Sequence, residues 1–338
     1  MGSHHGQTRI IRHAYGEGKG YVPLALRAQE LWIQLEKEAE ETLFSQTGVL
    51  TIGQRDASFI QEMITSSKEY SLLIEMLESE EVEERWPGIV MPAGYVACFE
   101  PTSGVIFSEK AIRAYRNLAL SHGANLLPYT QVERLVIEPS SITIQTNNGT
   151  YYGEKAIVTA GAWSKQLLAT VGLTLPLQPT RKAIGWFQAE KRLFAAQRFP
   201  AFVFNFPDET YYGFPCFDEQ GLKIGCHHGG QRVQPDQVDR HFGADKEDEG
   251  KLRRFLETYM PQAAGKLTKG GICLYNMTPD EHFIIDLHPE HNHVIIATGF
   301  SGHGFKFASS IGECLSEIIS RGNSSLDLSL FSLKRFNG

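Results

Sequence analysis

The chain contains 338 residues, 42% hydrophobic and 21% charged, which provides apolar side chains for a large core and excludes an intrinsically disordered chain. Lys and Arg number 32 and Asp and Glu 39, so the formal charge is −7 and a nucleic acid is not an expected partner. No apolar run approaches the ~18 residues of a membrane span and the first residues lack the apolar stretch of a signal peptide, which predicts a cytoplasmic protein with no membrane partner.

Helical and extended patterns alternate in the first part of the chain. Apolar residues recur every three or four positions behind Pro23, which is typical of a helix with Pro in its first turn. In chain order, the predicted elements are a helix over 24–39, a strand over 48–53, a helix capped by Asp56, a short helix from Ser79 to near Pro87, a strand over 95–99, and a helix capped by Ser108 that stops at Gly123.

The middle of the chain predicts a strand, a turn of small residues and a helix. A hairpin is expected over 141–152 around an Asn-Asn-Gly turn, and the apolar run 155–163 follows as a buried strand that enters a turn. A helix over 164–171 comes next. This order of strand, Gly-containing turn and helix is how α/β folds approach a nucleotide.

Sequence rich in strands begins after Pro176. Leu222 and Ile224 alternate with Lys223 and Gly225, the pattern of a strand with two different faces, and a mostly antiparallel sheet is predicted here. Because α/β patterns occur on both sides of this region, the predicted fold class is α/β, or α+β overall, with two discontinuous domains. The elements expected are strands over 183–189, 201–206, 211–217 and 221–227, a charged helix over 236–260, strands over 272–275, 283–287 and 294–297, and a helix containing Ile311 that ends at Gly322.

Neither the cysteines nor the histidines show the spacing of a metal site. The cysteines have no CxxC pair, which argues against a zinc site and a disulfide scaffold, and their odd number leaves at least one thiol free. His288, His291 and His293 predict a polar turn between strands, so no metal is expected. The five cysteines are Cys98, Cys216, Cys226, Cys273 and Cys314.

The segment 299–306 before the last helix is a candidate ligand site with two interpretations. Gly299, Gly302 and Gly304 would let the backbone approach a ligand at a helix N-terminus, but they also suit a tight packing turn. Lys306 is either a lysine whose stem packs on its Phe neighbours while its ammonium reaches water, or a clamp for an anion.

Arg9 and Arg12 form a second cluster of cations, next to apolar residues. Their spacing alone favours ordinary ion pairs over a ligand site.

Seven stretches of the sequence resemble the monomeric sarcosine oxidase and N-methyltryptophan oxidase family. Two further segments, LPLQPTRKAIGWFQAE and LDLSLFSLKRF, are more similar to the N-methyltryptophan oxidase branch. Together the matches run from Gly2 to the C-terminus. The seven stretches are GSHHGQTRIIRHAYGEGKGYVPLALRAQELW, FEPTSGVIFSE, IVTAGAW, YYGFP, LKIGCHHGGQ, PDEHFIIDLHPEH and GFSGHGFKFAS.

This resemblance implies a monomeric flavoenzyme that binds FAD covalently and oxidises the N-methyl group of an amino acid with O2. The implied products are the amino acid, formaldehyde and hydrogen peroxide. The flavin would supply the redox chemistry and the protein would supply binding, orientation and electrostatics.

Site roles also follow from the resemblance. Cys273 matches the cysteine that forms a thioether to the flavin 8α-methyl group, and Arg12 and Lys306 match the pair that clamps the substrate carboxylate. Lys223 matches the lysine near flavin N5 that activates O2. The remaining implied residues are Tyr212, His227 and Tyr275 around the substrate amine and methyl group, and His5, Arg9, Gly161, Gly302 and Gly304, with Lys306, around the flavin.

One departure from the family pattern bears on these expectations. The family begins with a strand, a GxGxxG turn and a helix that bind the ADP half of FAD, and this motif does not occur in the sequence. Loss of that unit would expose strand edges and apolar faces of its neighbours. We therefore expect an incomplete FAD-binding domain, formed by 1–44, 106–176 and 279–338, and a substrate domain formed by 45–105 and 177–278.

The sequence favours the first of three functions, and the other two remain open as alternatives. The first is an FAD-dependent oxidase of N-methyl-L-tryptophan or sarcosine. The second is a non-catalytic remnant that cannot hold FAD, and the third is a flavin amine dehydrogenase that passes electrons to a partner protein.

Overall fold

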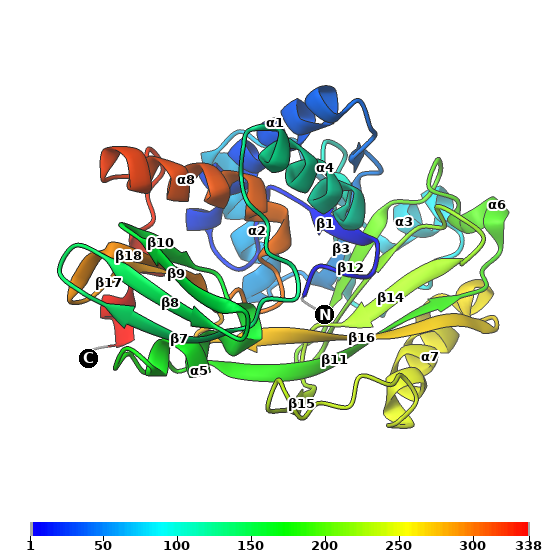
Figure 1. Cartoon of the computed structure of the whole chain (residues 1–338). Helices are drawn as coiled ribbons and strands as arrows, with labels where there is room; N and C mark the ends of the chain where they lie inside the picture. Colours follow the sequence, from blue (N-terminus) through cyan, green and yellow to red (C-terminus); the bar gives the residue numbers. More distant parts are fainter. Residues whose placement is uncertain (1–2, 337–338) are drawn as a thin grey trace.

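The computed structural model describes residues 3–336. Residues 1–2 and 337–338 lie outside the described residues. They are the first two residues of the predicted segment 1–44, including Gly2 of the first family-like stretch, and the last two of the predicted segment 279–338. A nine-stranded sheet, three three-stranded sheets and the helices between them build this part of the chain (Figure 1). Most strand pairs are antiparallel, whereas the pairs formed by 156–158 with 294–296 and by 201–205 with 49–53 are parallel. This mixture of helices and mostly antiparallel sheets confirms the predicted fold class.

The nine-stranded sheet draws its strands from two separate parts of the chain. One of its faces packs on a core that is rich in phenylalanine and includes Phe187, Phe202, Phe204 and, from the helix α7 (Glu247–Tyr259), Phe255. The strands, in their order across the sheet, are β15 (Gln231–Arg232), β11 (Gln178–Phe187), β14 (Leu222–Cys226), β13 (Thr210–Phe214), β12 (Ala201–Asn205), β3 (Val49–Gln54), β5 (Tyr95–Glu100) and β4 (Glu75–Leu77), and β16 (Leu267–Met277) pairs with β11.

The three smaller sheets lie at the other end of the molecule and above the large sheet. In Figure 1 the long strands β11 and β16 reach from the large sheet toward two of the smaller ones. The first sheet is β1 (Thr8–Ile11), β6 (Gly104–Phe107) and β2 (Phe44–Ser45); the second is β10 (Ala156–Val158), β18 (His291–Thr298) and β17 (Ile284–His288); the third is β7 (Val132–Ile137), β8 (Ile142–Thr146) and β9 (Gly149–Gly153).

The helices cover these sheets with apolar stripes. α1 packs against α8, and their apolar faces join Ile285, Ile295 and Phe331 in one core cluster. The α-helices are α1 (Val22–Ala39), α2 (Ser58–Glu69), α3 (Ser79–Arg85), α4 (Ser108–Ser121), α5 (Ser164–Ala169), α6 (Lys191–Phe194), α7 (Glu247–Tyr259) and α8 (Ala308–Arg321). Short 3-10 helices are η1 (Lys19–Tyr21), η2 (Gly161–Trp163), η3 (Pro261–Ala263), η4 (Phe305–Phe307), η5 (Ser329–Phe331) and η6 (Leu333–Phe336).

Several local predictions need correction. The residue before α2 is Ala57, so Asp56 is not its cap, and α3 is capped by Glu78 through a reciprocal capping box with Glu81. Ser108 is the first helical residue of α4, and its hydroxyl donates to the carbonyl of His4 instead of to the helix. The charged helix predicted over 236–260 begins at Glu247, because the preceding segment forms turns; and β7 was not predicted.

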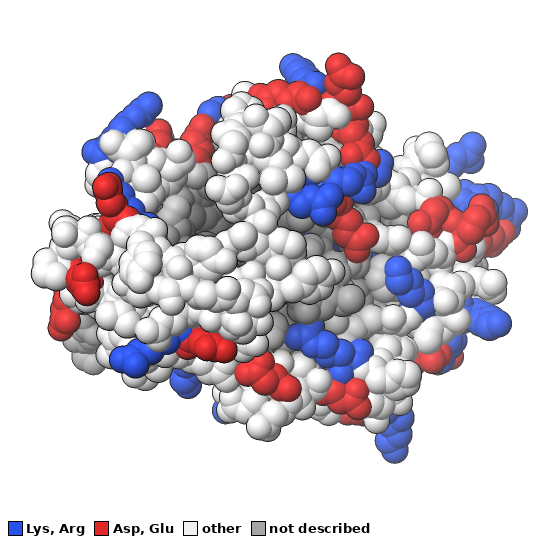
Figure 2. Space-filling model, viewed as in Figure 1, with Lys and Arg blue, Asp and Glu red and all other residues white. Residues whose placement is uncertain are grey.

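The strand β10 is less covered than its apolar sequence suggests. Among residues 3–336 it pairs with β18 along one edge, and the middle residue, Ile157, is 41% exposed, so the prediction of a buried strand is wrong at this residue. Exposed apolar side chains also gather on the segment 120–132 and on β9, where Figure 2 shows a broad area without charged residues. They include Leu126, Leu127, Tyr129 and Tyr152.

None of the helices described for residues 3–336 is long and apolar enough to cross a bilayer.

Candidate functional site

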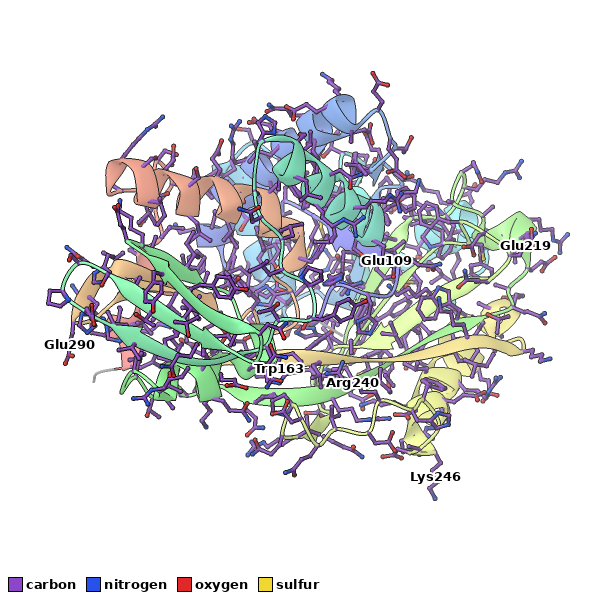
Figure 3. All side chains as sticks on the ribbon, in the orientation of Figure 1. Glu109, Trp163, Glu219, Arg240, Lys246 and Glu290 are labelled. Atoms are coloured by element: carbon purple, nitrogen blue, oxygen red, sulfur yellow. The ribbon has the colours of Figure 1, made fainter. Side chains whose placement is uncertain are left out.

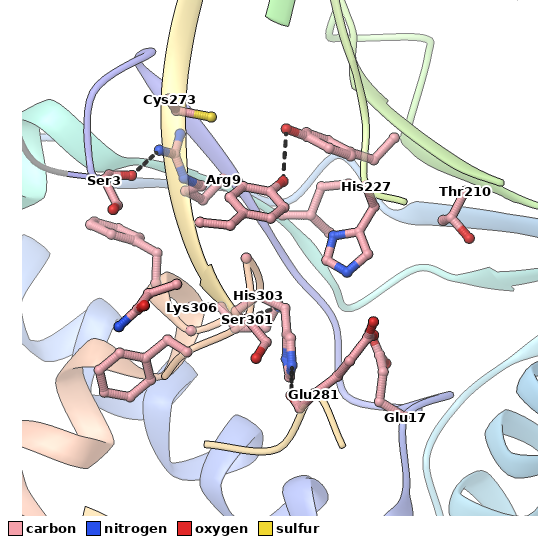
Figure 4. A pocket seen from close by; sticks show the side chains of 18 of the residues that line it. Ser3, Arg9, Glu17, Thr210, His227, Cys273, Glu281, Ser301, His303 and Lys306 are labelled. Carbon is pink, nitrogen blue, oxygen red and sulfur yellow. Dashed lines mark hydrogen bonds between the residues drawn. The ribbon is translucent and has the colours of Figure 1, made fainter. Parts of the chain in front are cut away.

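A cavity of about 960 Å³ lies between the nine-stranded sheet and the segments that carry β1 and the start of α8 (Figure 4). Cavities of up to ~1,000 Å³ are typical of small-molecule and cofactor sites. Most of the residues singled out in the sequence contribute to its wall. These are Arg9, Arg12, Gly161, Tyr212, Lys223, His227, Cys273, Tyr275, Gly302, Gly304 and Lys306.

The two-residue period of a strand explains how the sheet presents its site residues. In β14, Leu222, Ile224 and Cys226 enter the phenylalanine-rich core, so Lys223 lies on the opposite face and borders the cavity. Tyr212 and Phe214 of β13, and Cys273 and Tyr275 of β16, occupy equivalent alternate positions and border the cavity too. The sheet therefore separates a packed core on one face from a functional site on the other.

Arg12 and Glu17 form an ion pair at one end of the cavity. The guanidinium donates through Nη2 to both carboxylate oxygens of Glu17 at 2.7 Å, which confirms the ion pair expected for Arg12 from spacing alone. Its other terminal nitrogen, Nη1, is buried and has no hydrogen-bond partner in the described structure. The face of the guanidinium lies over the Tyr15 and Phe59 rings, at 4.5 and 5.1 Å from their centroids. Arg12 therefore has a buried donor atom that no described residue satisfies, at the wall of the cavity.

Lys306 lies beside this pair and is only 7% exposed. Its Nζ donates to the Tyr15 hydroxyl at 3.0 Å and to the His303 carbonyl at 2.8 Å. An ammonium group has three donors, so these two acceptors leave one N–H for another partner. The interpretation of Lys306 as a lysine that extends to water is wrong, because its side chain is enclosed.

Tyr15 and His303 complete a buried network behind Lys306. The Tyr15 hydroxyl and His303 Nδ1 are 2.7 Å apart, and His303 Nε2 lies 3.1 Å from the Glu281 carbonyl. Each member of the network is thereby held by at least two neighbours. The network fixes the position of the Lys306 ammonium at the cavity wall.

Burial and neighbouring charges change the proton affinities at this end of the site. Burial, with the positive charge of Arg12, lowers the pKa of Lys306 to about 7. Burial alone would raise the pKa of Glu17. The positive charge of Arg12, together with weaker contributions from other nearby side chains, outweighs this effect and lowers the pKa to about 2. Burial also lowers the pKa of His303 to about 4, so this ring is neutral at pH 7.

Lys223 lies at a different part of the wall and is held by the chain near the N-terminus. Its Nζ donates to the Gly6 carbonyl at 2.6 Å and to the carbonyl and hydroxyl of Thr8 at 2.9 and 3.1 Å. The Nζ also lies 4.3 Å from the centroid of the Phe214 ring. Burial, with the charge of Arg9, lowers the pKa of Lys223 well below its ordinary value.

The residues of β16 and its neighbours form the floor between these two ends. The Tyr275 and Tyr212 hydroxyls are 3.3 Å apart, and the His227 and Tyr275 rings have centroids 5.5 Å apart. Burial lowers the pKa of His227 well below its ordinary value, so its ring is neutral. Cys273 is a buried free thiol whose pKa is raised by burial.

Two predicted residues differ from the rest. His5 is not among the described residues that border the cavity; its Nε2 lies 2.7 Å from the Ile272 carbonyl on β16, one residue before Cys273. Arg9 uses its guanidinium to donate to the carbonyls of Ser3, His5 and Thr8. The ordinary ion pair favoured for Arg9 from spacing is therefore replaced by a set of backbone contacts that shape the turn before β1.

The glycines near the start of α8 pack closely against aromatic side chains and also border the cavity. A Cβ on Gly302 would lie 2.1 Å from the Tyr275 ring, and one on Gly304 would lie 2.5 Å from Phe300. The packing interpretation of this turn is therefore correct, although both glycines border the cavity. Gly161 differs, because its backbone has a φ of +55° and no described atom would lie within 4 Å of a Cβ added there, so the space above it is open toward the cavity.

Glu17, Tyr15 and His303 were not recognised as site residues in the sequence. Tyr15 and Glu17 belong to the Gly-rich segment 15–20, five or fewer residues after Arg12, and that closeness was the available signal. His303 lies inside the segment 299–306 that was recognised. Within residues 3–336, no group of three or more His, Cys, Asp or Glu side chains is placed to hold a metal ion.

Comparisons with known proteins identify relatives along nearly the whole chain. A family model described as FAD dependent oxidoreductase (DAO) matches residues 1–318. The chain is 52% identical over 336 residues to a monomeric sarcosine oxidase of Bacillus sp. (strain B-0618), covering 99% of this chain and 86% of that protein. It is 42% identical over 336 residues to an N-methyl-L-tryptophan oxidase of Yersinia pestis (strain Pestoides F), covering 99% of this chain and 89% of that protein.

Solved structures share the same architecture. L-proline dehydrogenase from P. horikoshii superposes with a TM-score of 0.86 at 25% identity and covers 99% of this chain and 88% of that one. NikD, an amino acid oxidase of nikkomycin biosynthesis, superposes with a TM-score of 0.84 at 22% identity over 98% of this chain and 87% of that one. Together with the family match and the more similar relatives, the shared fold shows that this chain belongs to the DAO family of FAD-dependent oxidoreductases.

Proposed function

We propose that this enzyme oxidatively demethylates an N-methyl amino acid with O2, giving the amino acid, formaldehyde and hydrogen peroxide. The net reaction consumes one water, which supplies the oxygen of formaldehyde. The relatives named as oxidases of sarcosine and of N-methyl-L-tryptophan support this reaction. The name of the Bacillus relative also supports a monomer, and we propose that the enzyme works as one in the cytoplasm.

The observation that carries the proposal is the pair of unused donors on Arg12 and Lys306. Arg12 Nη1 is buried without a partner, and the Lys306 ammonium has one donor left after Tyr15 and the His303 carbonyl. A buried donor without an acceptor is costly, so the two groups favour an anion between them. A carboxylate, which every amino acid carries, accepts such charge-assisted hydrogen bonds.

The cavity has residues that suit a flavin. Its volume of about 960 Å³ is large enough for a flat ring system beside a small substrate, and the open space above Gly161 lets a ligand approach the backbone. Cys273 would hold the flavin covalently through a thioether, and His5 and Arg9 would support its ring. When bound, the flavin accepts the two electrons of the substrate and passes them to O2.

The remaining residues would orient the substrate and promote its reaction with O2. His227 is neutral because it is buried, so it can accept a hydrogen bond from the substrate amine. Tyr212 and Tyr275 would enclose the methyl group beside it. Lys223 would place a positive charge where negative charge develops on O2, and such electrostatic stabilisation is usually the largest single contribution to catalysis.

The direct test is to purify the full chain and measure flavin absorbance together with peroxide formation. We expect a yellow protein that forms hydrogen peroxide and formaldehyde in equal amounts from sarcosine or N-methyl-L-tryptophan. A colourless protein would favour the non-catalytic remnant instead. A yellow protein that is reduced by these substrates but transfers electrons only to an added protein acceptor would favour the dehydrogenase.

The covalent link has its own test. Cys273→Ser removes the thiol with little change in volume, so the flavin should become extractable with acid or denaturant, whereas it stays with the parent protein. Cys314→Ser, at another buried thiol that does not itself border the cavity, is the matched control and should keep the flavin attached. Covalent flavin in Cys273→Ser would contradict the assignment.

A further inference from the structure

A second cavity, of about 430 Å³, lies behind Lys223. Both cavities are bordered by Lys223 and Phe214, so these two side chains stand between them. Lys223 is only 3% exposed and is held there by the Gly6 carbonyl and by Thr8. A molecule in the second cavity can therefore approach the Lys223 ammonium without passing Arg12 or Lys306.

Aromatic side chains border the second cavity beside Lys223. Trp186 and Phe214 lie beside Lys223, with ring centroids 5.5 and 4.3 Å from its Nζ. Phe107 and Phe217 also border the cavity and meet edge to face, with centroids 5.0 Å apart. Phenylalanine rings form no hydrogen bonds, so this part of the wall replaces little of the hydration that a charged molecule would lose.

Charged residues border the same cavity as well. Glu109, labelled in Figure 3 at the end of α4 that faces the large sheet, accepts hydrogen bonds from the backbone N–H groups of Gly6 and Gln7 at 3.0 and 3.2 Å. Lys110, Arg113 and Asp218 border the cavity too and are exposed or partly exposed. The second cavity thus combines a charged rim with an aromatic interior that ends at Lys223.

We propose that the second cavity is the route by which dioxygen reaches Lys223, separate from the cavity that receives the amino acid. This inference rests on the proposed function. Dioxygen is small, neutral and apolar, so an aromatic passage admits it, whereas a zwitterionic amino acid would lose its hydration there without compensation. At Lys223, dioxygen gains the two electrons and two protons that the amine loses, and it leaves as hydrogen peroxide.

The first test needs no catalytic activity. Crystals of the protein pressurised with xenon, an apolar atom used here as a probe for dioxygen, should show a xenon site between Phe217 and Phe214 in the second cavity. Xenon confined to the main cavity, or absent from both, would overturn the proposal.

The second test narrows the passage in the flavin-loaded enzyme. Phe217→Trp should slow the reaction of the reduced enzyme with O2 at least threefold, while anaerobic reduction by an N-methyl amino acid keeps its rate. Phe206→Trp, which narrows the main cavity, is the matched variant and should leave the O2 reaction unchanged. The opposite pattern would place the route in the main cavity and refute the inference.

These outcomes separate the two proposals. If N-methyl amino acids reduce the flavin in neither the parent nor the variants, the proposed function fails, and the xenon site still reports on the passage. If reduction is normal and either the xenon or the Phe217→Trp result is negative, the passage alone fails.

Discussion

Two buried lysines border the same cavity, and their surroundings are very different. Lys306 has two oxygen acceptors and lies beside an arginine with an unused donor, so its end of the site is short of acceptors. Lys223 has three oxygen acceptors from the chain itself and aromatic rings around it. Burial lowers the pKa of both. The comparison teaches that burial alone does not distinguish the two lysines, whereas the number of hydrogen-bond acceptors around each ammonium does.

The largest expected effect is at Lys223 and concerns only the reaction with O2, not reduction by the substrate. Lys223→Met should slow the reaction of the reduced enzyme with O2 about 100-fold or more, because loss of one electrostatic stabiliser costs about 10²–10³ in rate. Anaerobic reduction by substrate should change little. Stopped-flow absorbance measures both steps, and equal slowing of the two would remove the distinction between the lysines.

A smaller effect is expected at the other lysine. Lys306→Met should raise the KM for the N-methyl amino acid about 10-fold to 100-fold, since a hydrogen bond to a charged group contributes roughly 1.5–3 kcal/mol. The O2 reaction should keep its rate. Lys165→Met, at an exposed lysine of α5, is the control and should leave both quantities unchanged. An unaltered KM in Lys306→Met would show that the carboxylate binds elsewhere.

The smallest effect is a dependence on pH. Burial and Arg12 lower the pKa of Lys306 to about 7, so this group is an ammonium below that pH and loses its charge as pH rises. The affinity for a simple carboxylate such as acetate should therefore fall by up to about 10-fold per pH unit above pH 7. The fall should end at the higher pKa that Lys306 has when acetate is bound. Titration of the flavin spectrum with acetate measures it. Lys306→Met should bind acetate weakly at every pH, and a constant affinity in the parent from pH 6 to 9 would contradict the assignment.

Periodic segments of the fold were predictable, and irregular ones were not. The helix behind Pro23 and the strands around Lys223 follow their apolar patterns closely, because burial of one face depends only on local spacing. Helix beginnings were misplaced at Asp56 and Ser108, since a cap requires a backbone geometry that residue type does not specify. The segment 236–246 continues the charged composition of α7 and was therefore included in the predicted helix. It instead forms turns, and two of its backbone carbonyls accept hydrogen bonds from Arg181.

Within the site, the residue types were recognisable but their partners were not. Arg12, Lys306 and Lys223 were singled out from the sequence, whereas Glu17 became a site residue only through its contact with Arg12. Lys306 and His303 lie close together in the chain, yet Tyr15, which binds both, comes from the opposite end. Contacts between residues so far apart in sequence are fixed by packing alone.

The sequence by itself determined the family, the mixed fold class and the cationic residues that border the cavity, because motifs, periodicity and residue chemistry are local properties. Only the tertiary structure decided which of these residues meet. It enclosed Lys306 and Lys223, left Arg12 Nη1 without a partner and placed a second cavity behind Lys223. Burial and the supply of hydrogen-bond acceptors depend on elements brought together from the whole chain, and no local pattern contains them.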